Sequence, residues 1–222
     1  MKLGNRLLAA LAVSSIAQLG LSAASLAQDA YTIGATTYSR SFEFYQDIEA
    51  GMKEEGGDQV TFDFRDPNGD LAAQTAQMED FVAKGVNLVT MVPIDSTAGE
   101  AAARLVTSAG IPLITVDIAV TADVGQVAHI ASDNHFGGEI PAQKMAELLG
   151  NKGEVLVINN PAIVSVVDRE KGFVEKLAEI APDVKVVASQ SGDSKREKAQ
   201  AVAEDLLQAH PNAAGIIAVN DE

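Results

Sequence analysis

The stretch VNLVTMVPIDSTAGEAAARLVTSAGIPLITVD, residues 86–117, holds two short apolar runs on either side of a helical pattern. The runs are residues 86–92 and 111–116. Between them, apolar residues recur at the spacing of one helix face: Ala98, Ala102, Leu105 and Ala109. A strand, a helix and a second strand in this order form a parallel pair, because the helix carries the chain back to the end of the sheet where it started. This stretch therefore predicts an α/β fold.

The same alternation continues in both directions along the chain. Five further apolar runs, separated by helical patterns, lie at residues 31–36, 60–64, 154–158, 184–188 and 215–219. Most of these runs are continuously apolar, as strands in the middle of a parallel sheet are. The run at 60–64 alternates between apolar and polar residues, so we expect it nearer an edge. Together they predict parallel sheets flanked by helices on both faces.

Local signals mark some of the helix boundaries. Gly85 and Gly110 stand where a helix end needs a left-handed residue. Thr97 and Glu100 have the spacing of a capping box, which predicts a helix start at Thr97.

Residues 119–134 (AVTADVGQVAHIASDN) interrupt the rhythm with a polar loop, a short apolar piece and a new helix start. We interpret this segment as the passage from one α/β lobe to another. The expected division is therefore a first lobe at 28–130 and a second lobe at 131–222, after a targeting segment at 1–27.

Residues 1–27 have the features of a secretory signal peptide. Lys2 and Arg6 precede an uncharged apolar stretch, and Ser25-Leu26-Ala27 supplies the small-x-small pattern at which signal peptidases cleave. Polar residues interrupt the apolar stretch, whereas a membrane span would sustain it over ~20 residues. We expect cleavage after Ala27 and export of the mature chain to the periplasm.

Composition narrows the possible partners. The chain carries 16 Lys and Arg against 31 Asp and Glu, a formal net charge of −15. Such a balance disfavours binding to nucleic acid or to anionic membranes. The sequence contains no Cys, which excludes disulfides, thiol chemistry and a Cys-linked lipid anchor.

Polar residues gather after the predicted strands, where open parallel sheets bind ligands. Asp117 follows the run at 111–116 and Asn220 follows the run at 215–219. The segment after the first run adds three aromatic residues: Phe42, Phe44 and Tyr45. Carboxylate, amide and rings suit a small neutral sugar or polyol. Alternatively, Phe44 and Tyr45 belong to the core and Asp117 caps a turn.

The sequence offers little for catalysis. Its three histidines are scattered, and the motifs of metalloproteases, serine hydrolases, P-loop enzymes and dinucleotide-binding folds are missing. Without Cys or clustered His, a metal could be held by carboxylates alone. We expect a binding protein without catalytic activity, cofactor or metal.

Several segments, in order along residues 31–222, resemble the ribose-type sugar-binding proteins of bacterial ABC transporters, which are periplasmic binding proteins of fold type I. The segments are DPNGDLAAQTAQMEDFVAKGVNLVTMVPIDSTA, IPLITVD, HIASDNHFGGEIPAQKMAELLG, DREKGF and GIIAVNDE. The resemblance implies two Rossmann-like lobes that close on a sugar, a monomer, and a membrane permease that recognises the closed form. In that family the chain continues past the Asn-Asp-Glu segment, so the resemblance implies an incomplete second lobe here.

The resemblance also assigns roles to individual residues. Phe44 and Tyr45 match the pair that stacks on the sugar, Asp117 matches the carboxylate that holds two hydroxyls, and Asn220 matches the cleft amide. Phe42 falls where the family often has Asn. Arg169 matches a position that looks structural.

Four positions depart from the family's binding residues: Val92, Ile118, Val167 and Ser194 stand in place of an amide, two arginines and a ring. They predict a ligand with fewer hydroxyls to satisfy, namely a short sugar alcohol, a deoxy sugar or a mixed polar–apolar metabolite, and they predict that ribose binds poorly.

Other functions are compatible with the same resemblance. A ligand carrier for a chemoreceptor or sensor kinase would use the same fold and the same cleft. A sugar-modifying enzyme on this scaffold would need a base or nucleophile beside Asp117, and the sequence suggests none. The effector domain of a LacI-type repressor shares the fold, but the expected signal peptide argues firmly against it, because it stands where that family has its helix-turn-helix.

Overall fold

The structure, a computed structural model, describes residues 31–220. The predicted signal peptide at 1–27 lies outside the described residues, as do Asp221 and Glu222. The elements are β1 (Tyr31–Thr36), α1 (Glu43–Gly56), η1 (Gly57–Gln59), β2 (Val60–Arg65), α2 (Leu71–Lys84), β3 (Leu88–Met91), α3 (Glu100–Ser108), β4 (Leu113–Val116), β5 (Ala128–Ile130), α4 (Asn134–Leu149), β6 (Lys152–Asn159), α5 (Val164–Ile180), β7 (Asp183–Ser191), α6 (Arg196–Ala209) and β8 (Ala213–Ala218). None of the helices in this range is long and apolar enough to cross a membrane.

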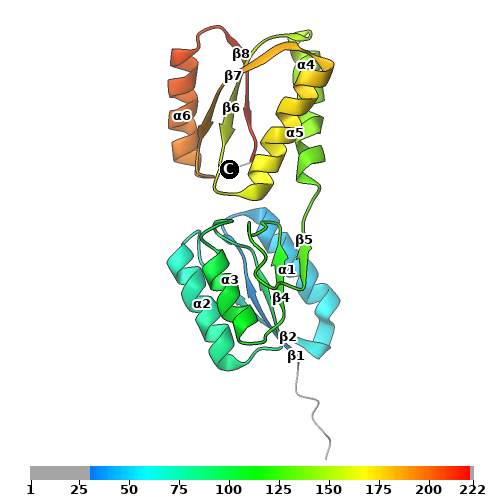
Figure 1. Cartoon of the computed structure of the whole chain (residues 1–222), viewed down its shortest axis with the longest axis vertical. Helices are drawn as coiled ribbons and strands as arrows, with labels where there is room; N and C mark the ends of the chain where they lie inside the picture. Colours follow the sequence, from blue (N-terminus) through cyan, green and yellow to red (C-terminus); the bar gives the residue numbers. More distant parts are fainter. Residues whose placement is uncertain (1–30, 221–222) are drawn as a thin grey trace, which may run out of the picture.

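The strands form two separate parallel sheets, one in each lobe (Figure 1). The first lobe contains a five-stranded sheet in the order β2-β1-β3-β4-β5, and the second lobe contains β7-β6-β8. Every pair of neighbouring strands is parallel. The predicted α/β fold with parallel sheets is confirmed, and β2 lies at an edge as its alternating pattern predicts.

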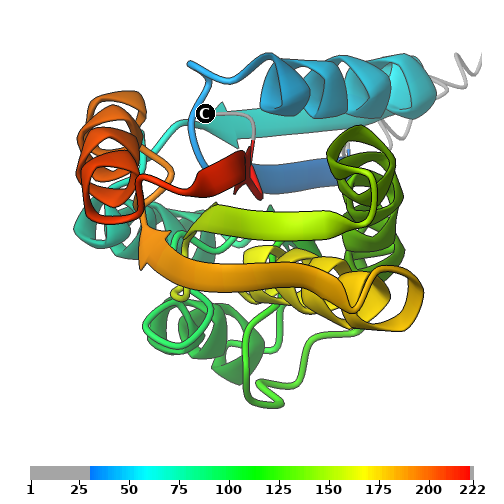
Figure 2. The same ribbon diagram turned by 90° about the horizontal axis from the view of Figure 1, so that it is seen from above.

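Strand β6 shows why a central parallel strand is apolar throughout. Val155 and Val157 face a core cluster with α4 and α5, whereas Leu156 and Ile158 face a second cluster with α6. Because successive side chains of a strand point to opposite faces, a strand covered on both sides has no polar face. Figure 2 shows α6 on one side of the three strands and the α4–α5 pair on the other.

Two details differ from the sequence predictions. The short apolar piece expected within residues 119–134 contains strand β5, which was not among the predicted strands: its three residues are exposed, and it pairs with β4 at the edge of the first sheet. Helix α3 begins at Glu100, and its N-cap is Gly99 rather than Thr97. The capping-box prediction is therefore wrong: Asp95 Oδ1 accepts from the N–H groups of Thr97 and Ala98. The left-handed glycines are confirmed, with φ of 64° at Gly85 and 78° at Gly110.

One core cluster crosses the boundary between the lobes. Tyr45, Val92 and Ile118 come from the first lobe, and they pack with a larger set of second-lobe residues that includes Ile163 and Val219. All five side chains are buried. The two lobes are thus in direct contact through apolar side chains, as in a closed arrangement.

Helices α4 and α5 cross at two glycines. A Cβ on Gly138 would overlap the carbonyl oxygen of Arg169, and a Cβ on Gly172 would overlap that of His135. Only residues without a side chain fit where two helix backbones come this close. The crossing fixes α5, and with it Arg169, against α4.

His135 on α4 links the same two helices on the outside, since its Nε2 lies 2.9 Å from Glu175 Oε2 on α5. The hydrogen bond to Glu175, and the charges of Glu175 and Glu139, raise the pKa of His135 above its ordinary 6.5, against a lowering effect of Lys171. The same hydrogen bond lowers the pKa of Glu175 below its ordinary 4.5.

The sign of these shifts gives a testable pH dependence. The raised His135 pKa stabilises the fold fully below pH 6.5, and that contribution is lost as pH rises through the folded pKa. The lowered Glu175 pKa contributes above pH 4.5, and that part is lost as pH falls through the folded value. NMR titration should give a His135 pKa above 6.5 that falls in Glu175→Gln. An unchanged value in this variant would contradict the pairing.

Candidate functional site

A cavity of about 490 Å³ lies between the two lobes. Its wall combines residues from the carboxyl ends of strands in both sheets with residues of α1, α4 and α5. The lining residues are Tyr38, Phe42, Phe44, Tyr45, Asp117, Ile118, Gly137, Gly138, Pro141, Ile163, Ser165, Val166, Arg169, Phe173, Ser194, Ile217, Ala218, Val219 and Asn220.

Aromatic rings form the first-lobe wall of this cavity. Tyr38 stacks on Phe42 and on Tyr45, with ring centroids 5.9 and 6.2 Å apart, and Phe44 meets Tyr45 edge-on at 5.1 Å. Tyr45 is 7% exposed, whereas Phe44 is 47% exposed. Such a wall offers flat apolar surface to a ligand with C–H groups on one side.

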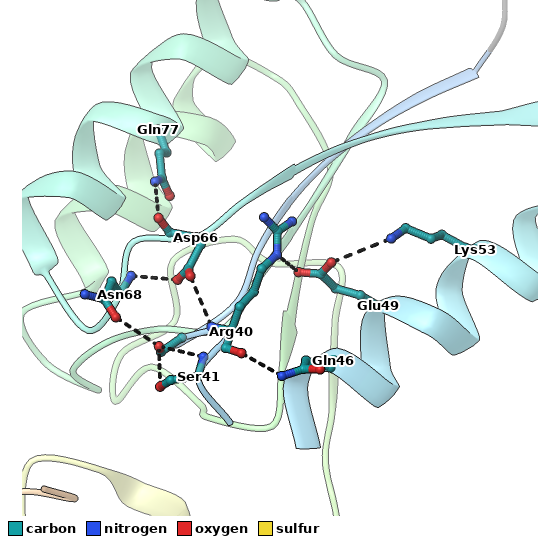
Figure 3. Close-up of polar contacts among 9 residues, drawn as sticks. Arg40, Ser41, Gln46, Glu49, Lys53, Asp66, Asn68 and Gln77 are labelled. Atoms are coloured by element: carbon teal, nitrogen blue, oxygen red, sulfur yellow. Dashed lines mark hydrogen bonds and ion pairs between the residues drawn. The ribbon is translucent and has the colours of Figure 1, made fainter. Parts of the chain in front are cut away.

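The aromatic segment is held in place by polar contacts from outside the cavity (Figure 3). The N–H of Arg40 donates to Asp66 Oδ2 at 3.2 Å, and the guanidinium of Arg40 donates to Glu49 Oε1 at 2.7 Å. Gln46 Nε2 donates to the carbonyl of Arg40 at 2.8 Å. The β2–α2 loop also donates through Gly69 to the carbonyl of Tyr38. These bonds tie the segment to α1 and to that loop, so its rings have a fixed position.

Asp117 is the carboxylate of the cavity wall. It follows β4, is 9% exposed, and has a φ of 61°, in the left-handed region that Asp tolerates better than most residues. Its Oδ2 accepts a hydrogen bond of 2.9 Å from the Tyr45 hydroxyl. Burial first, and then Asp117, raise the pKa of Tyr45, so its hydroxyl stays a donor at neutral pH. A rare backbone conformation at a lined cavity is typical of binding sites.

On the second lobe, Arg169 of α5 organises the polar part of the wall. Its Nε donates to Asn134 Oδ1 at 2.9 Å, and its Nη1 donates to the Val219 carbonyl at 3.0 Å and to Asn220 Oδ1 at 3.3 Å. Asn220 Nδ2 in turn lies 3.4 Å from Ser194 Oγ. Arg169 thus joins the start of α4 to the end of β8 while lining the cavity.

The structure brings all five predicted site residues, Phe42, Phe44, Tyr45, Asp117 and Asn220, to this one cavity. Their role in binding is still a prediction.

The departures from the family pattern divide into two groups. Ile118 and Ser194 line the cavity, whereas Val92 is buried in the core cluster and Val167 is 41% exposed; neither valine is part of the wall.

Sequence reasoning missed Tyr38 and Ser165 and gave Arg169 a structural role only. Tyr38 carried a signal, because it stands in the same aromatic-rich segment as Phe42. Arg169 is both structural and part of the wall. Within residues 31–220, no group of three or more His, Asp or Glu side chains is placed to hold a metal ion.

Comparison with known proteins agrees with this architecture. Residues 21–222 match the model of the periplasmic binding protein domain. The ribose import binding protein of Bacillus subtilis is 31% identical over 195 residues, which are 86% of this chain and 62% of that protein. The xylitol-binding protein of Mycolicibacterium smegmatis is 28% identical over 222 residues, 96% of this chain and 62% of that protein. The chain therefore spans less than two thirds of the length of these relatives.

A solved structure shows the same fold. The periplasmic solute-binding protein of an ABC transporter from Actinobacillus succinogenes, with bound D-allose, superposes with a TM-score of 0.73 at 29% identity. The match covers 86% of this chain and 69% of that one. Two α/β lobes around a lined cavity and the match across residues 21–222 lead to one conclusion: the chain belongs to the family of periplasmic binding protein domains.

Proposed function

We propose that this protein is a periplasmic solute-binding protein that captures a small neutral sugar or polyol and delivers it to the membrane permease of an ABC transporter. The observation that carries the proposal is the cavity between the lobes, which is lined by stacked aromatic rings, a carboxylate and an amide. The ribose and xylitol proteins among its relatives are named for ligands of this class.

The chemistry of the wall suits a hydroxylated ligand. The Asp117 carboxylate accepts hydrogen bonds from hydroxyls, and a charged acceptor makes each bond worth about 1.5–3 kcal/mol. Asn220 and Ser194 supply neutral donors and acceptors on the opposite lobe. The rings of Phe42 and Phe44 offer apolar surface to the C–H side of the molecule.

The apolar part of the wall narrows the ligand class. Ile118 stands beside Asp117 where the family has an arginine, and Ile163, Val166 and Ile217 add further apolar surface. A ligand hydroxyl buried against such side chains without a partner costs about 1–3 kcal/mol. The preferred ligand therefore has few hydroxyls to satisfy, as a short sugar alcohol, a deoxy sugar or a mixed polar–apolar metabolite does.

We further propose that residues 1–27 are a signal peptide removed after Ala27, and that the mature protein acts as a monomer. Binding is reversible, without cofactor, metal or chemical change to the ligand. We also propose that the first lobe comprises residues 28–130 and the second lobe residues 131–222, so that the ligand binds at the boundary between the two lobes.

The test is a thermal-shift screen of the protein against aldopentoses, aldohexoses, tetritols, pentitols and deoxy sugars. We expect a clear rise in melting temperature with tetritols or deoxy sugars and a small one with ribose. A large shift with ribose or glucose and none with the others would contradict the ligand class. No shift with any compound, in a protein that melts cooperatively, would contradict the proposed function itself.

A further inference from the structure

A serine of the first lobe hydrogen-bonds to the backbone of the second lobe. Ser96 lies in the loop between β3 and α3, and its N–H donates to the carbonyl of Ala162 at 3.0 Å. Its hydroxyl accepts from the N–H of Val164 at 3.0 Å. Val164 is the first residue of α5, so a single side chain bridges the two lobes at the start of a helix.

Helix α5 has no side-chain cap of its own at this end. Its N-cap residue is Ile163, which makes no side-chain hydrogen bond to the first turn. The first N–H groups of a helix have no partner within the helix, and Ser is among the residues that most often satisfy them. Ser96 therefore supplies from the other lobe the hydroxyl that α5 lacks in its own sequence.

The loop that carries Ser96 is fixed to the first lobe. Gln74 of α2 is fully buried, donates through Nε2 to the carbonyl of Val92 at 2.7 Å, and accepts through Oε1 from the N–H of Ile94 at 3.1 Å. Asp95 closes the following turn through the N–H of Thr97. If the second lobe moved away, Ser96 would therefore stay with the first lobe, and its hydrogen bonds to Ala162 and Val164 would break.

Ser96 is 2% exposed and does not line the cavity. Its two bonds to the second lobe join protein atoms directly. They add to the apolar contacts that cross between the lobes through Tyr45 and Ile118.

We propose that Ser96 is a positioning residue that holds the lobes closed by capping α5 across the boundary, and that it keeps a closed fraction populated in the absence of ligand. The apparent affinity of a protein that binds in one conformation scales with the population of that conformation. The effect of Ser96 on ligand affinity rests on the proposed function, because it applies only if the cavity binds a ligand. The effect of Ser96 on the closed fraction does not depend on which ligand the protein binds.

The experiment measures the distance between the lobes in ligand-free protein. Because the sequence has no Cys, spin labels can be placed at two exposed positions by Glu79→Cys on α2 and Gln208→Cys on α6. These two helices lie on the same side of the molecule (Figure 1). Double electron–electron resonance then compares this labelled protein with Ser96→Ala, Ser96→Thr and Thr97→Ala. Thr97 is the matched control, since its hydroxyl bonds to Thr121 within the first lobe.

We expect native protein to show a short-distance, closed population, and Ser96→Ala to raise the ratio of open to closed protein about three- to tenfold, as the loss of a helix cap implies. Ser96→Thr keeps a hydroxyl and should restore most of the closed fraction, and Thr97→Ala should resemble native protein. A wholly open native protein, or equal distributions in native and Ser96→Ala, would overturn the proposal. The proposed function is tested by the sugar screen alone, so failure of one is distinguishable from failure of the other.

Discussion

Replacing Asp117 by alanine is expected to weaken sugar or polyol binding more than 100-fold, because the carboxylate that holds the ligand's hydroxyls is removed. Two charge-assisted hydrogen bonds of about 1.5–3 kcal/mol each exceed the ~2.8 kcal/mol that corresponds to 100-fold. Alanine also tolerates the left-handed φ of 61° less well than Asp does. Asp117→Asn is therefore the sharper variant, since Asn accepts this backbone and keeps an oxygen for the Tyr45 hydroxyl.

Isothermal titration calorimetry with the strongest compound of the sugar screen measures this loss, and thermal melts check the fold. Asp95→Asn is the matched control: Asp95 follows the neighbouring strand β3 and caps a turn, but does not line the cavity. We expect Asp95→Asn to bind within about twofold of native protein. If Asp117→Asn binds as tightly as that control, Asp117 is a turn residue and the ligand is held by other groups.

The second large effect is expected at the crossing of α4 and α5. Helix propensity alone predicts that Gly172→Ala stabilises the protein by about 1 kcal/mol. The packing predicts the opposite sign, because the new Cβ would overlap backbone atoms of His135, which cannot rotate away. Overpacking of this kind costs about 1–3 kcal/mol or more. Set against the propensity gain, this leaves a net destabilisation of up to about 2 kcal/mol, so we expect a melting temperature lower by up to roughly 8 °C, at 2–4 °C per kcal/mol.

Gly137→Ala is the matched control for this substitution. Gly137 lies on the same helix pair, but the nearest atom to its new Cβ would be Cγ of Arg169, at an ordinary 3.7 Å. Differential scanning calorimetry should therefore find Gly137→Ala as stable as native protein or slightly more stable. A rise in melting temperature in both variants would mean that the helices separate easily.

The fold was largely predictable because buried parallel strands leave a strong pattern. The run at 31–36 coincides with β1, and the run at 154–158 lies within β6. β5 was not among the predicted strands because it is three residues long and exposed, so the short apolar piece around it was too short to indicate a strand. The start of α3 was misplaced because Asp95 Oδ1 accepts from the N–H groups of Thr97 and Ala98 in a turn ahead of the helix, and Glu100 Oε1 accepts from the Thr121 hydroxyl instead of reaching back to Thr97.

The sequence predicted those site residues that follow a strand or belong to the aromatic segment, but it did not predict the site residues on helix α5. Asp117 and Asn220 follow their strands directly, so topology alone brings them to the cavity. Arg169 was assigned only a structural role, because its place in the middle of α5 carries no such marker and depends on how α4 and α5 cross. Val92 lies in the core cluster and not in the cavity wall. This could not be predicted, because the position of Val92 in the sequence does not determine the direction of its side chain after the end of β3.

The stacked tyrosines of the cavity wall give this protein a built-in optical signal. The sequence contains three Tyr and no Trp. Two of the three, Tyr38 and Tyr45, line the cavity, and Tyr45 is bonded to a carboxylate, an environment known to quench phenol emission. Without tryptophan to accept the excitation energy, fluorescence from the unlabelled protein comes from tyrosine alone, and two of the three tyrosines line the site. A ligand that displaces the Tyr45–Asp117 bond should therefore brighten the emission, so occupancy can be followed in real time without any attached dye.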